Sequence, residues 1–145
     1  MQERLKIRLA TGEDWENILP LFVQLYHGDI GPNLQKVFVR LTKGKDGCVL
    51  VAEWDEKLVG LIIGNYYMDL DWEGKTAKLQ AIIVNKKRRN RGIGRKLLSR
   101  FLTQAKENNC RAVTARVNRK NRKANNFYER LNFKDAGTAE YILEL

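Results

Sequence analysis

The hydrophobic pattern in the first third of the chain changes from a period of two to a period near 3.6. Residues 4–9 alternate charged and apolar side chains, which is typical of a strand with one face on a core. Thr11 and Asp14 resemble a capping box, and apolar positions then recur at helical spacing as far as Gly28. Apolar residues within 33–42 repeat in the same way, so we predict a second, shorter helix there.

The middle of the chain is rich in β-branched and aromatic residues. We predict two antiparallel strands at 48–54 and 58–67, because the connection over 55–57 has the length of a hairpin loop. A polar connection over 68–74 leads to residues 77–84, which are mostly apolar, as a strand covered on both faces must be. We therefore expect 77–84 to be the central strand.

The last third of the chain predicts two further helices and three strands. In order, we expect a helix over 93–109, a strand over 112–117, a helix over 123–131 and closing strands over 133–138 and 141–145. No repeat, linker or low-complexity segment interrupts this order. The sequence thus predicts an α/β fold in one domain, residues 1–145, with a single mixed, mostly antiparallel sheet of about six to seven strands and helices on both faces.

The composition narrows the class of protein. The 145 residues are 43% hydrophobic and 30% charged, as in a globular domain that buries one core. No apolar run approaches the ~20 residues of a membrane span, and residues 1–4 lack the apolar region of a signal peptide. We therefore expect a cytoplasmic protein without membrane contact.

The residue content gives little support to metal-dependent or covalent catalysis. Cys48 and Cys110 stand far apart without Cys or His neighbours at metal-ligand spacing, and His27 is the only histidine. We expect no metal site and interpret both cysteines as ordinary core residues. His27 directly precedes Gly28, so we interpret it as an end-of-helix residue without a chemical role.

The net charge of +10 is concentrated in one segment. Residues 86–123 contain 15 Lys and Arg and a single acid, Glu107, for a net charge of +14, whereas the other residues contain 12 basic and 16 acidic side chains. The remainder of the chain therefore has a net charge of −4. Such a segment favours a polyanionic partner, which a nucleic-acid backbone satisfies as well as a small polyphosphate ligand.

A glycine turn, Gly92-Ile93-Gly94, lies inside this basic segment. It does not fit the Walker pattern, and Leu97 replaces the third glycine of the dinucleotide fingerprint. What remains is a short turn that opens into a helix, so several backbone N–H groups and the positive end of the helix dipole face one point. Five surrounding cations favour a ligand with several phosphates: Arg88, Arg89, Arg91, Arg95 and Lys96.

Two motifs resemble those of a known family. Arg89-x-x-Gly92-x-Gly94, after an apolar strand ending at Val84, resembles the acyl-CoA signature of the GNAT superfamily of N-acyltransferases. The block Asn121-x-x-Ala124-x-x-Phe127-Tyr128, followed by Phe133, is similar to the downstream motif of that family. Together with the strand from Leu79, they span residues 79–133 in the family's order.

The sequence departs from the family pattern at two positions. Asn132 stands where a glycine is usual, and asparagine tolerates the left-handed backbone that such a turn needs. Gln80 stands where many relatives have a glutamate that acts as general base. The side chain of Gln80 cannot take up a proton at neutral pH.

The resemblance implies that an amine attacks the thioester of acetyl-CoA directly, without an acetyl-enzyme intermediate. It also implies that Tyr128 is catalytic and protonates the departing thiolate. In the family, the backbone around Ile82–Val84 pairs with the pantetheine arm. The residues implied to hold acetyl-CoA are Ile82, Ile83, Val84, Arg89, Asn90, Arg91, Gly92, Ile93, Gly94, Arg95, Asn121, Ala124 and Tyr128.

The sequence defines the acceptor side less well. We predict that Asp69, Asp71 and Glu73 attract a cationic amine and that water relays its proton through Gln80. A small-molecule amine is the acceptor we expect, with a protein N-terminus or lysine as the alternative.

The competing interpretation of the protein's function is a non-catalytic nucleic-acid-binding module, although no RNA-recognition aromatic motif is present. Tyr141–Leu143 could extend a sheet into a second copy, which leaves a homodimer open.

Overall fold

The computed structural model describes residues 4–145, which divide into two compact units. The first unit ends at Ala115 and the second spans Arg116–Leu145. One domain over residues 1–145 stays a prediction. In chain order the elements are β1 (Leu5–Leu9), η1 (Gly12–Asp14), α1 (Trp15–Tyr26), α2 (Leu34–Thr42), β2 (Gly47–Trp54), β3 (Lys57–Asp69), β4 (Gly74–Val84), η2 (Lys86–Arg88), α3 (Ile93–Glu107), β5 (Ala112–Ala115) and α4 (Arg122–Arg130).

The first unit contains one five-stranded sheet with the order β1-β2-β3-β4-β5. Three neighbouring pairs are antiparallel and the β4–β5 pair is parallel, which confirms the predicted mixed, mostly antiparallel sheet. The expectation that 77–84 is the central strand is wrong, because β3 lies in the middle and β4 lies second from the edge. The β2–β3 hairpin is confirmed, and Asp55 and Glu56 take left-handed backbones in its tight turn.

Two predicted strands, 133–138 and 141–145, are absent, so the described residues form five strands instead of six to seven. Alternating residues show only that a segment suits a strand, which also needs a neighbouring strand to pair its N–H and C=O groups. The C-terminal residues bond locally instead. The carboxylate of Asp135 accepts from the backbone N–H of Gly137 at 2.8 Å and from Arg119 at 2.6 Å.

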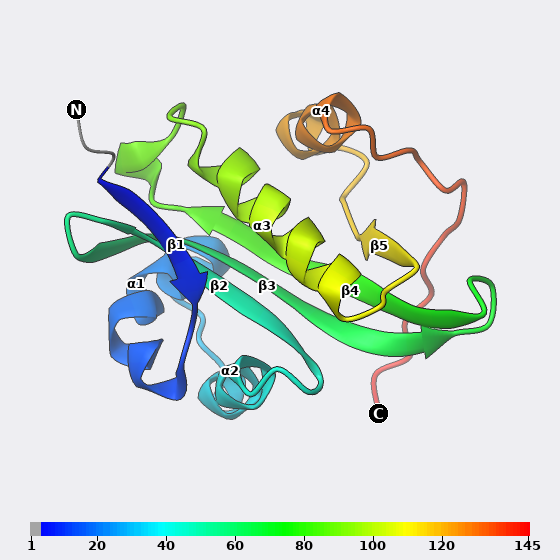
Figure 1. Ribbon diagram of the computed structural model, residues 1–145, viewed down its shortest axis with the longest axis horizontal. Coiled ribbons are helices and arrows are strands. Elements are labelled where there is room, and N and C mark those ends of the chain that lie inside the picture. The colour runs from blue at the N-terminus through cyan, green and yellow to red at the C-terminus, as the bar shows by residue number, and fades with distance from the viewer. Residues whose placement is uncertain (1–3) are drawn as a thin grey trace. The chain divides into compact units, whose positions relative to one another are not determined.

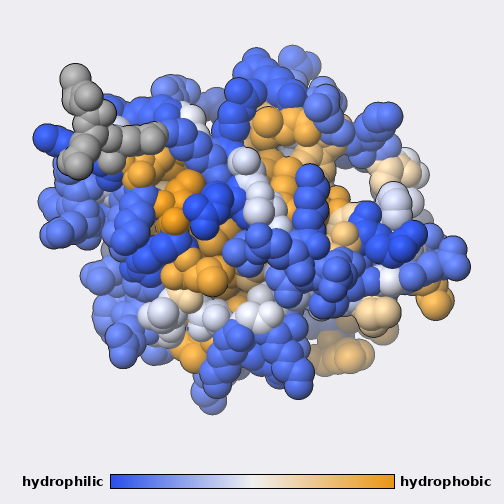
Figure 2. Space-filling model, in the orientation of Figure 1, coloured by the Kyte–Doolittle hydropathy of each residue, from blue (hydrophilic) through white to orange (hydrophobic). Residues whose placement is uncertain are grey.

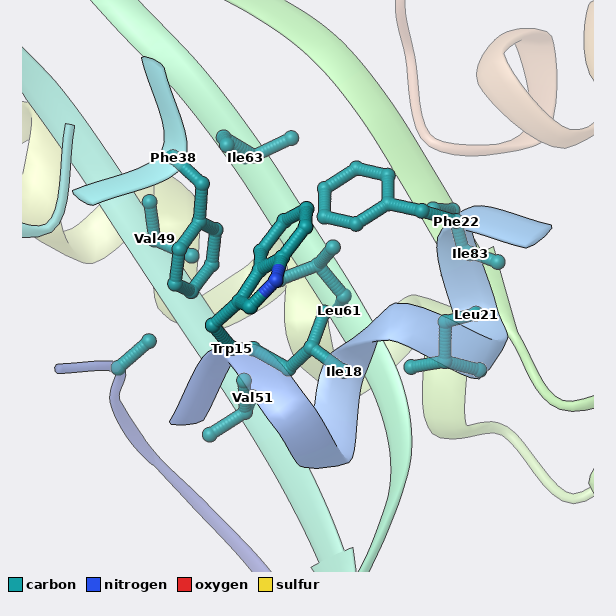
Figure 3. Close-up of a cluster of buried hydrophobic side chains, with 11 residues drawn as sticks. Trp15, Ile18, Leu21, Phe22, Phe38, Val49, Val51, Leu61, Ile63 and Ile83 are labelled. Atoms are coloured by element: carbon teal, nitrogen blue, oxygen red, sulfur yellow. The ribbon is translucent and has the colours of Figure 1, made fainter. Parts of the chain in front are cut away.

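Helices cover both faces of the sheet, as predicted (Figure 1). α1 and α2 pack on one face, where Trp15, Phe22 and Phe38 meet with ring centroids between 5.6 and 6.3 Å apart. Figure 3 shows these three rings packed over Leu61 and Ile63 of β3. α3 crosses the opposite face and buries one apolar stripe, formed by Ile93, Leu97, Leu98, Phe101 and Ala105.

A glycine in β3 determines how closely α3 approaches the sheet. A Cβ atom at Gly64 would lie 2.6 Å from Cζ of Phe101 and 2.7 Å from the carbonyl oxygen of Lys78. Packed atoms do not approach so closely, so only glycine lets the Phe101 ring rest directly on the β3 backbone. The height of α3 above the sheet depends on this contact.

The predicted capping box is present, at the start of η1, which leads directly into α1. The carboxylate of Asp14 accepts from the backbone N–H of Thr11 at 2.8 Å and from two nitrogens of Arg8 at 2.8 Å each. Arg8 also donates to Glu53 at 2.6 Å. The hydrogen bond from Arg8 holds the pKa of Asp14 below its ordinary value, and this partly buried ion pair joins β1 to η1.

Candidate active site

The second half of β4 has an edge without a strand partner. β5 pairs with β4 only at Thr76–Leu79, so no strand of the described chain lies beside residues 80–84 on that side. The N–H of Asn85 donates to the carbonyl oxygen of Val59 in β3 at 2.8 Å. Because successive residues of a strand alternate, the carbonyl of Val84 points away from β3. The backbone that the resemblance implies to pair with the pantetheine arm therefore lies on an edge without a strand partner among the described residues.

The side chain of Gln24, in α1, contacts the end of this open edge. Its Nε2 donates to the carbonyl oxygen of Val84 at 3.0 Å, and its Oε1 accepts from the backbone N–H of Lys86 at 3.1 Å. One carboxamide thus joins the last residue of β4 to the first residue of η2. The hydrophobic pattern does not predict this contact, because a polar residue on an amphipathic helix ordinarily faces solvent.

A β-bulge places Gln80 at the start of the open edge. Ile63 pairs with Ala81 while Gly64 pairs with Leu79, which leaves Gln80 as the extra residue. The Gln80 side chain is exposed, and its Nε2 donates to Oδ1 of Asn65 on β3. Two neutral amides therefore occupy the position where the resemblance leads one to look for a base.

The glycine turn lies directly beyond β4 and η2, at the start of α3. Asn90 and Gly92 both have left-handed backbones, with φ of 63° and 76°. A Cβ atom at Gly92 would meet nothing within 4 Å, so the need for glycine there comes from its φ. α3 begins at Ile93, and the backbone N–H groups of its first turn have no partner within the helix. These groups and the helix dipole form a site suited to a phosphate.

Cations surround this turn in the structure as they do in the sequence. The side chains of Arg89, Arg91 and Arg95 are exposed, and none of them forms a salt bridge with a described residue. Arg88 and Arg91 both lie over the ring of Trp54, which no motif indicated. Figure 2 shows the face on which α3 lies, and its surface is mainly hydrophilic.

The downstream motif belongs to the second unit. Oδ1 of Asn121 accepts from the backbone N–H of Ala124 at 3.1 Å, so Asn121 caps α4 and keeps its Nδ2 group for another partner. The ring of Tyr128 lies 5.3 Å from that of Phe127 and 5.2 Å from that of Phe133. Burial raises the pKa of Tyr128, so its phenol remains protonated well above neutral pH.

The three acidic candidates lie at the other end of β4. β3 extends to Asp69 and β4 begins at Gly74, so the predicted polar connection is shorter than expected. Asp69 accepts from Tyr67 Oη at 3.0 Å and from the N–H of Asp71 at 2.8 Å, which stabilises the turn. At ~3.3 Å per residue this turn lies roughly 20 Å along β4 from Gln80. The structure does not bring Asp69, Asp71 or Glu73 to the open edge.

A cavity that is widely open to solvent, with a volume of about 360 Å³, lies on the surface where α1 ends and the chain leads into α2. Its lining includes Tyr26, Asp29, Leu34 and Val37. The side chains of Tyr26 and Val37 are about half exposed. The carboxylate of Asp29 and the apolar surface of these two residues are therefore accessible to solvent at the same place. Tyr26 follows Gln24 by two residues in α1, which places this cavity at the same end of the helix as the contact with β4.

The cysteines lack the environment of a nucleophile. Cys48 is buried, and burial raises the pKa of its thiol to about 11. Burial also raises the pKa of Cys110. Both residues are therefore thiols at neutral pH, not the thiolates that attack a thioester. Within residues 4–145 there is no group of three or more His, Cys, Asp or Glu placed to hold a metal, and no helix long and apolar enough to cross a membrane.

The chain has relatives whose sequences match most of its length. The model of the acetyltransferase (GNAT) family matches residues 15–133. An uncharacterised N-acetyltransferase of Archaeoglobus fulgidus is 29% identical over 136 aligned positions, in a match that covers 86% of this chain and 89% of that protein. Another, from Methanocaldococcus jannaschii, is 29% identical over 140 residues. That match covers 89% of this chain but only 60% of the longer relative.

Solved structures share the fold at lower sequence identity. The structure of AAC(6')-Iy with a bisubstrate analogue of CoA and acetylneamine superposes with a TM-score of 0.87 at 16% identity, covering 99% of each chain. A ribosomal-protein-alanine N-acetyltransferase from Brucella melitensis biovar Abortus gives a TM-score of 0.78 at 19% identity. That match covers 97% of this chain and 99% of the other. At these identities the likeness concerns the fold alone.

Proposed function

Because the chain belongs to the acetyltransferase (GNAT) family and is an N-acetyltransferase, we propose that it transfers the acetyl group of acetyl-CoA directly to a small cationic amine. The observation that carries the proposal is the open edge of β4 at residues 80–84, which leads through η2 into the unpaired N–H groups at the start of α3. An extended thioester arm and a pyrophosphate fit these two features in that order along the chain.

The cofactor side of the proposal uses backbone and arginine groups. The backbone of Ile82–Val84 pairs with the pantetheine arm, and the N–H groups from Ile93 to Arg95 bind the pyrophosphate. Arg89 and Arg91 add charge-assisted hydrogen bonds to phosphate oxygens, because both are exposed and lack an acidic partner among the described residues. Asn90 and Gly92 supply the left-handed turn that directs these groups to one place.

The chemistry is a single displacement. The neutral amine attacks the carbonyl carbon, the C–N bond forms as the C–S bond breaks, and the proton from Tyr128 Oη neutralises the departing thiolate. The nitrogen loses its second proton as the amide forms, and that proton restores the phenol of Tyr128 through water. The raised pKa of Tyr128 keeps that proton available at neutral pH. From the downstream motif, Asn121 binds the cofactor through its Nδ2 group and Ala124 contacts it.

The amine must lose a proton before it attacks, because an alkylamine with a pKa near 10 is almost wholly protonated at pH 7. Neither Gln80 nor Asn65 can act as a base, so the proton leaves through water that the two amides orient. Such a mechanism predicts rates that increase with pH. Asp69, Asp71 and Glu73 remain predicted to attract the acceptor from a distance, since they lie far from the bulge.

We assign the acceptor to the cavity between α1 and α2. The carboxylate of Asp29 attracts an ammonium group, while the exposed faces of Tyr26 and Val37 receive apolar carbons. The volume of about 360 Å³ suits a small amine. A protein N-terminus or lysine is the rival acceptor, and the charge of residues 86–123 favours an acidic partner over a basic one.

Thermal unfolding with and without acetyl-CoA tests the proposed function first. A ligand at 100 times its dissociation constant stabilises the folded protein by ~2.7 kcal/mol, so the midpoint should rise by several degrees at moderate salt. ATP and NAD at the same concentration are the controls and should not reproduce the rise. An unchanged midpoint with millimolar acetyl-CoA would refute the cofactor assignment.

An acceptor screen then separates the candidate substrates. Polyamines, aminoglycosides, amino acids and basic peptides are compared by release of free CoA thiol. We expect turnover with a small amine, and we expect Asp29→Asn to raise the KM for that amine without changing the KM for acetyl-CoA. Turnover with peptides alone would favour the protein acceptor.

A further inference from the structure

Trp54, the last residue of β2, lies against two arginines from the segment before α3. The guanidinium carbon of Arg88 lies 5.6 Å from the centre of the Trp54 ring, and that of Arg91 lies 5.9 Å from it. Both distances fall within the ~6 Å range of cation–π attraction, for which tryptophan is the best ring. The backbone of Trp54 is held from both sides, because it pairs with Leu5 of β1 and Lys57 of β3.

The arrangement places two like charges within cation–π distance of one ring. Arg88 and Arg91 form no salt bridge with any residue from 4 to 145, so no carboxylate of that part of the chain neutralises either charge. Free arginine side chains would move apart in water, because they repel each other and lose rotamer freedom when held. The left-handed backbones of Asn90 and Gly92 turn the chain between Arg88 and α3. An anion that binds both guanidinium groups removes the repulsion.

We propose that Trp54 is a positioning residue for acetyl-CoA, which holds Arg88 and Arg91 in place before the phosphate groups of the cofactor arrive. The inference rests on the proposed function and adds to it a residue outside both motifs. The ring bears no charge and contacts the cations, so its effect on binding passes through them. Holding two side chains in advance lowers the conformational entropy lost on binding, and thus strengthens phosphate binding.

The experiment measures the dissociation constant of CoA by titration calorimetry for the parent protein, Trp54→Ala and Trp54→Phe. We expect Trp54→Ala to raise the Kd about three- to tenfold and Trp54→Phe to raise it less, because phenylalanine keeps a weaker aromatic face. In steady state, the KM for acetyl-CoA should rise while kcat at saturating acetyl-CoA changes less than about twofold. Arg100→Ala, which removes an exposed cation of α3 away from Trp54, is the matched control and should change the Kd less than about twofold.

A second series tests whether Trp54 acts through the arginines. Arg88→Ala/Arg91→Ala is compared with the triple variant that also contains Trp54→Ala. The proposal predicts the same Kd for both, because the ring has nothing left to position. An equal weakening by Trp54→Ala with and without the arginines would overturn it, as would an unchanged Kd in Trp54→Ala.

The same experiment checks that each variant folds and that the parent protein binds CoA. The unfolding midpoint of each variant is measured without ligand, and if Trp54→Ala does not fold, the comparison is made with Trp54→Phe in both backgrounds. A parent protein that binds no CoA refutes the proposed function and this role together. A parent that binds CoA while the Trp54 variants bind it equally well refutes this role alone.

Discussion

The side-chain amide of Gln80 donates a hydrogen bond to the side-chain oxygen of Asn65 on the neighbouring strand. Gln80 is the extra residue of a β-bulge, so this bond fixes an exposed side chain at the start of the open edge of β4. Gln80 stands at this position, where the resemblance to the family leads one to expect a glutamate. In the mechanism that we propose, the proton of the amine therefore leaves through water that these neutral groups orient.

We expect Gln80→Ala to lower kcat only about two- to tenfold, because a residue that orients water contributes less than a general base does. Removing a general base lowers the rate by a factor of ~10² to 10⁴. Asn65→Ala should have a similar effect, and the double variant should be little worse than either single one. A loss larger than a hundredfold in Gln80→Ala would show a direct role in the chemistry.

The contact of Gln24 with Val84 and Lys86 predicts a second effect on the cofactor side. Gln24→Leu keeps the size of the side chain but leaves one backbone acceptor and one donor without their partner. Such a loss costs about 1–3 kcal/mol where the groups are shielded from water. We expect a lower unfolding midpoint and weaker acetyl-CoA binding. Gln35→Leu, at an exposed position of α2, should change neither quantity.

Tyr128→Phe should lower kcat by a factor of about 10² or more and leave the Kd of acetyl-CoA nearly unchanged. The phenol has a raised pKa and stays protonated up to strongly alkaline pH, so it does not limit the rate between pH 7 and 9. In that range kcat/KM for the amine should rise with pH as the amine loses its proton. A variant with the parent rate would disprove the acid assignment, and Tyr67→Phe is the control.

Gly92→Val should abolish the thermal shift caused by acetyl-CoA. The backbone of Gly92 has φ of 76°, a conformation that strongly disfavours a β-branched residue, so the turn before α3 must change. Gly137→Val is a matched control, because Gly137 has φ of 71° but lies in the second unit. This control should retain the shift even if its stability falls. Retention of the shift in Gly92→Val would argue against phosphate binding at this turn.

The Arg8–Asp14 pair predicts how stability depends on pH. The pKa of Asp14 is lower in the folded state than in the unfolded state, because Arg8 donates hydrogen bonds to its carboxylate. The charged carboxylate therefore stabilises the fold above the unfolded pKa of about 3.9. That contribution is lost as pH falls through the lower folded value. Asp14→Asn should reduce the free energy of unfolding by about 1–3 kcal/mol at pH 7 and by less near pH 3. An equal difference at both pH values would contradict this explanation.

The sequence predicts the elements of the first unit well, because each has a clear period and an end signal such as the Thr11–Asp14 box or Gly28. It does not predict strand order, since the pattern of residues 77–84 shows burial but not which neighbours cover it. The prediction of two closing strands is wrong for a related reason, because alternating residues in 133–145 do not specify a strand with which they could pair. Gln24 and Trp54 could not be predicted either, because their contacts join residues far apart in the sequence and depend on packing.

The contact between Gly64 and Phe101 limits how this protein can evolve. Any side chain at position 64 would displace the ring at position 101 and lift the helix whose first turn is proposed to hold the phosphates. Descendants that gain an alanine at position 64 should therefore need both a smaller residue at position 101 and a shift of the β4 backbone at Lys78. The two positions are expected to vary together across lineages, although neither is proposed to touch a substrate.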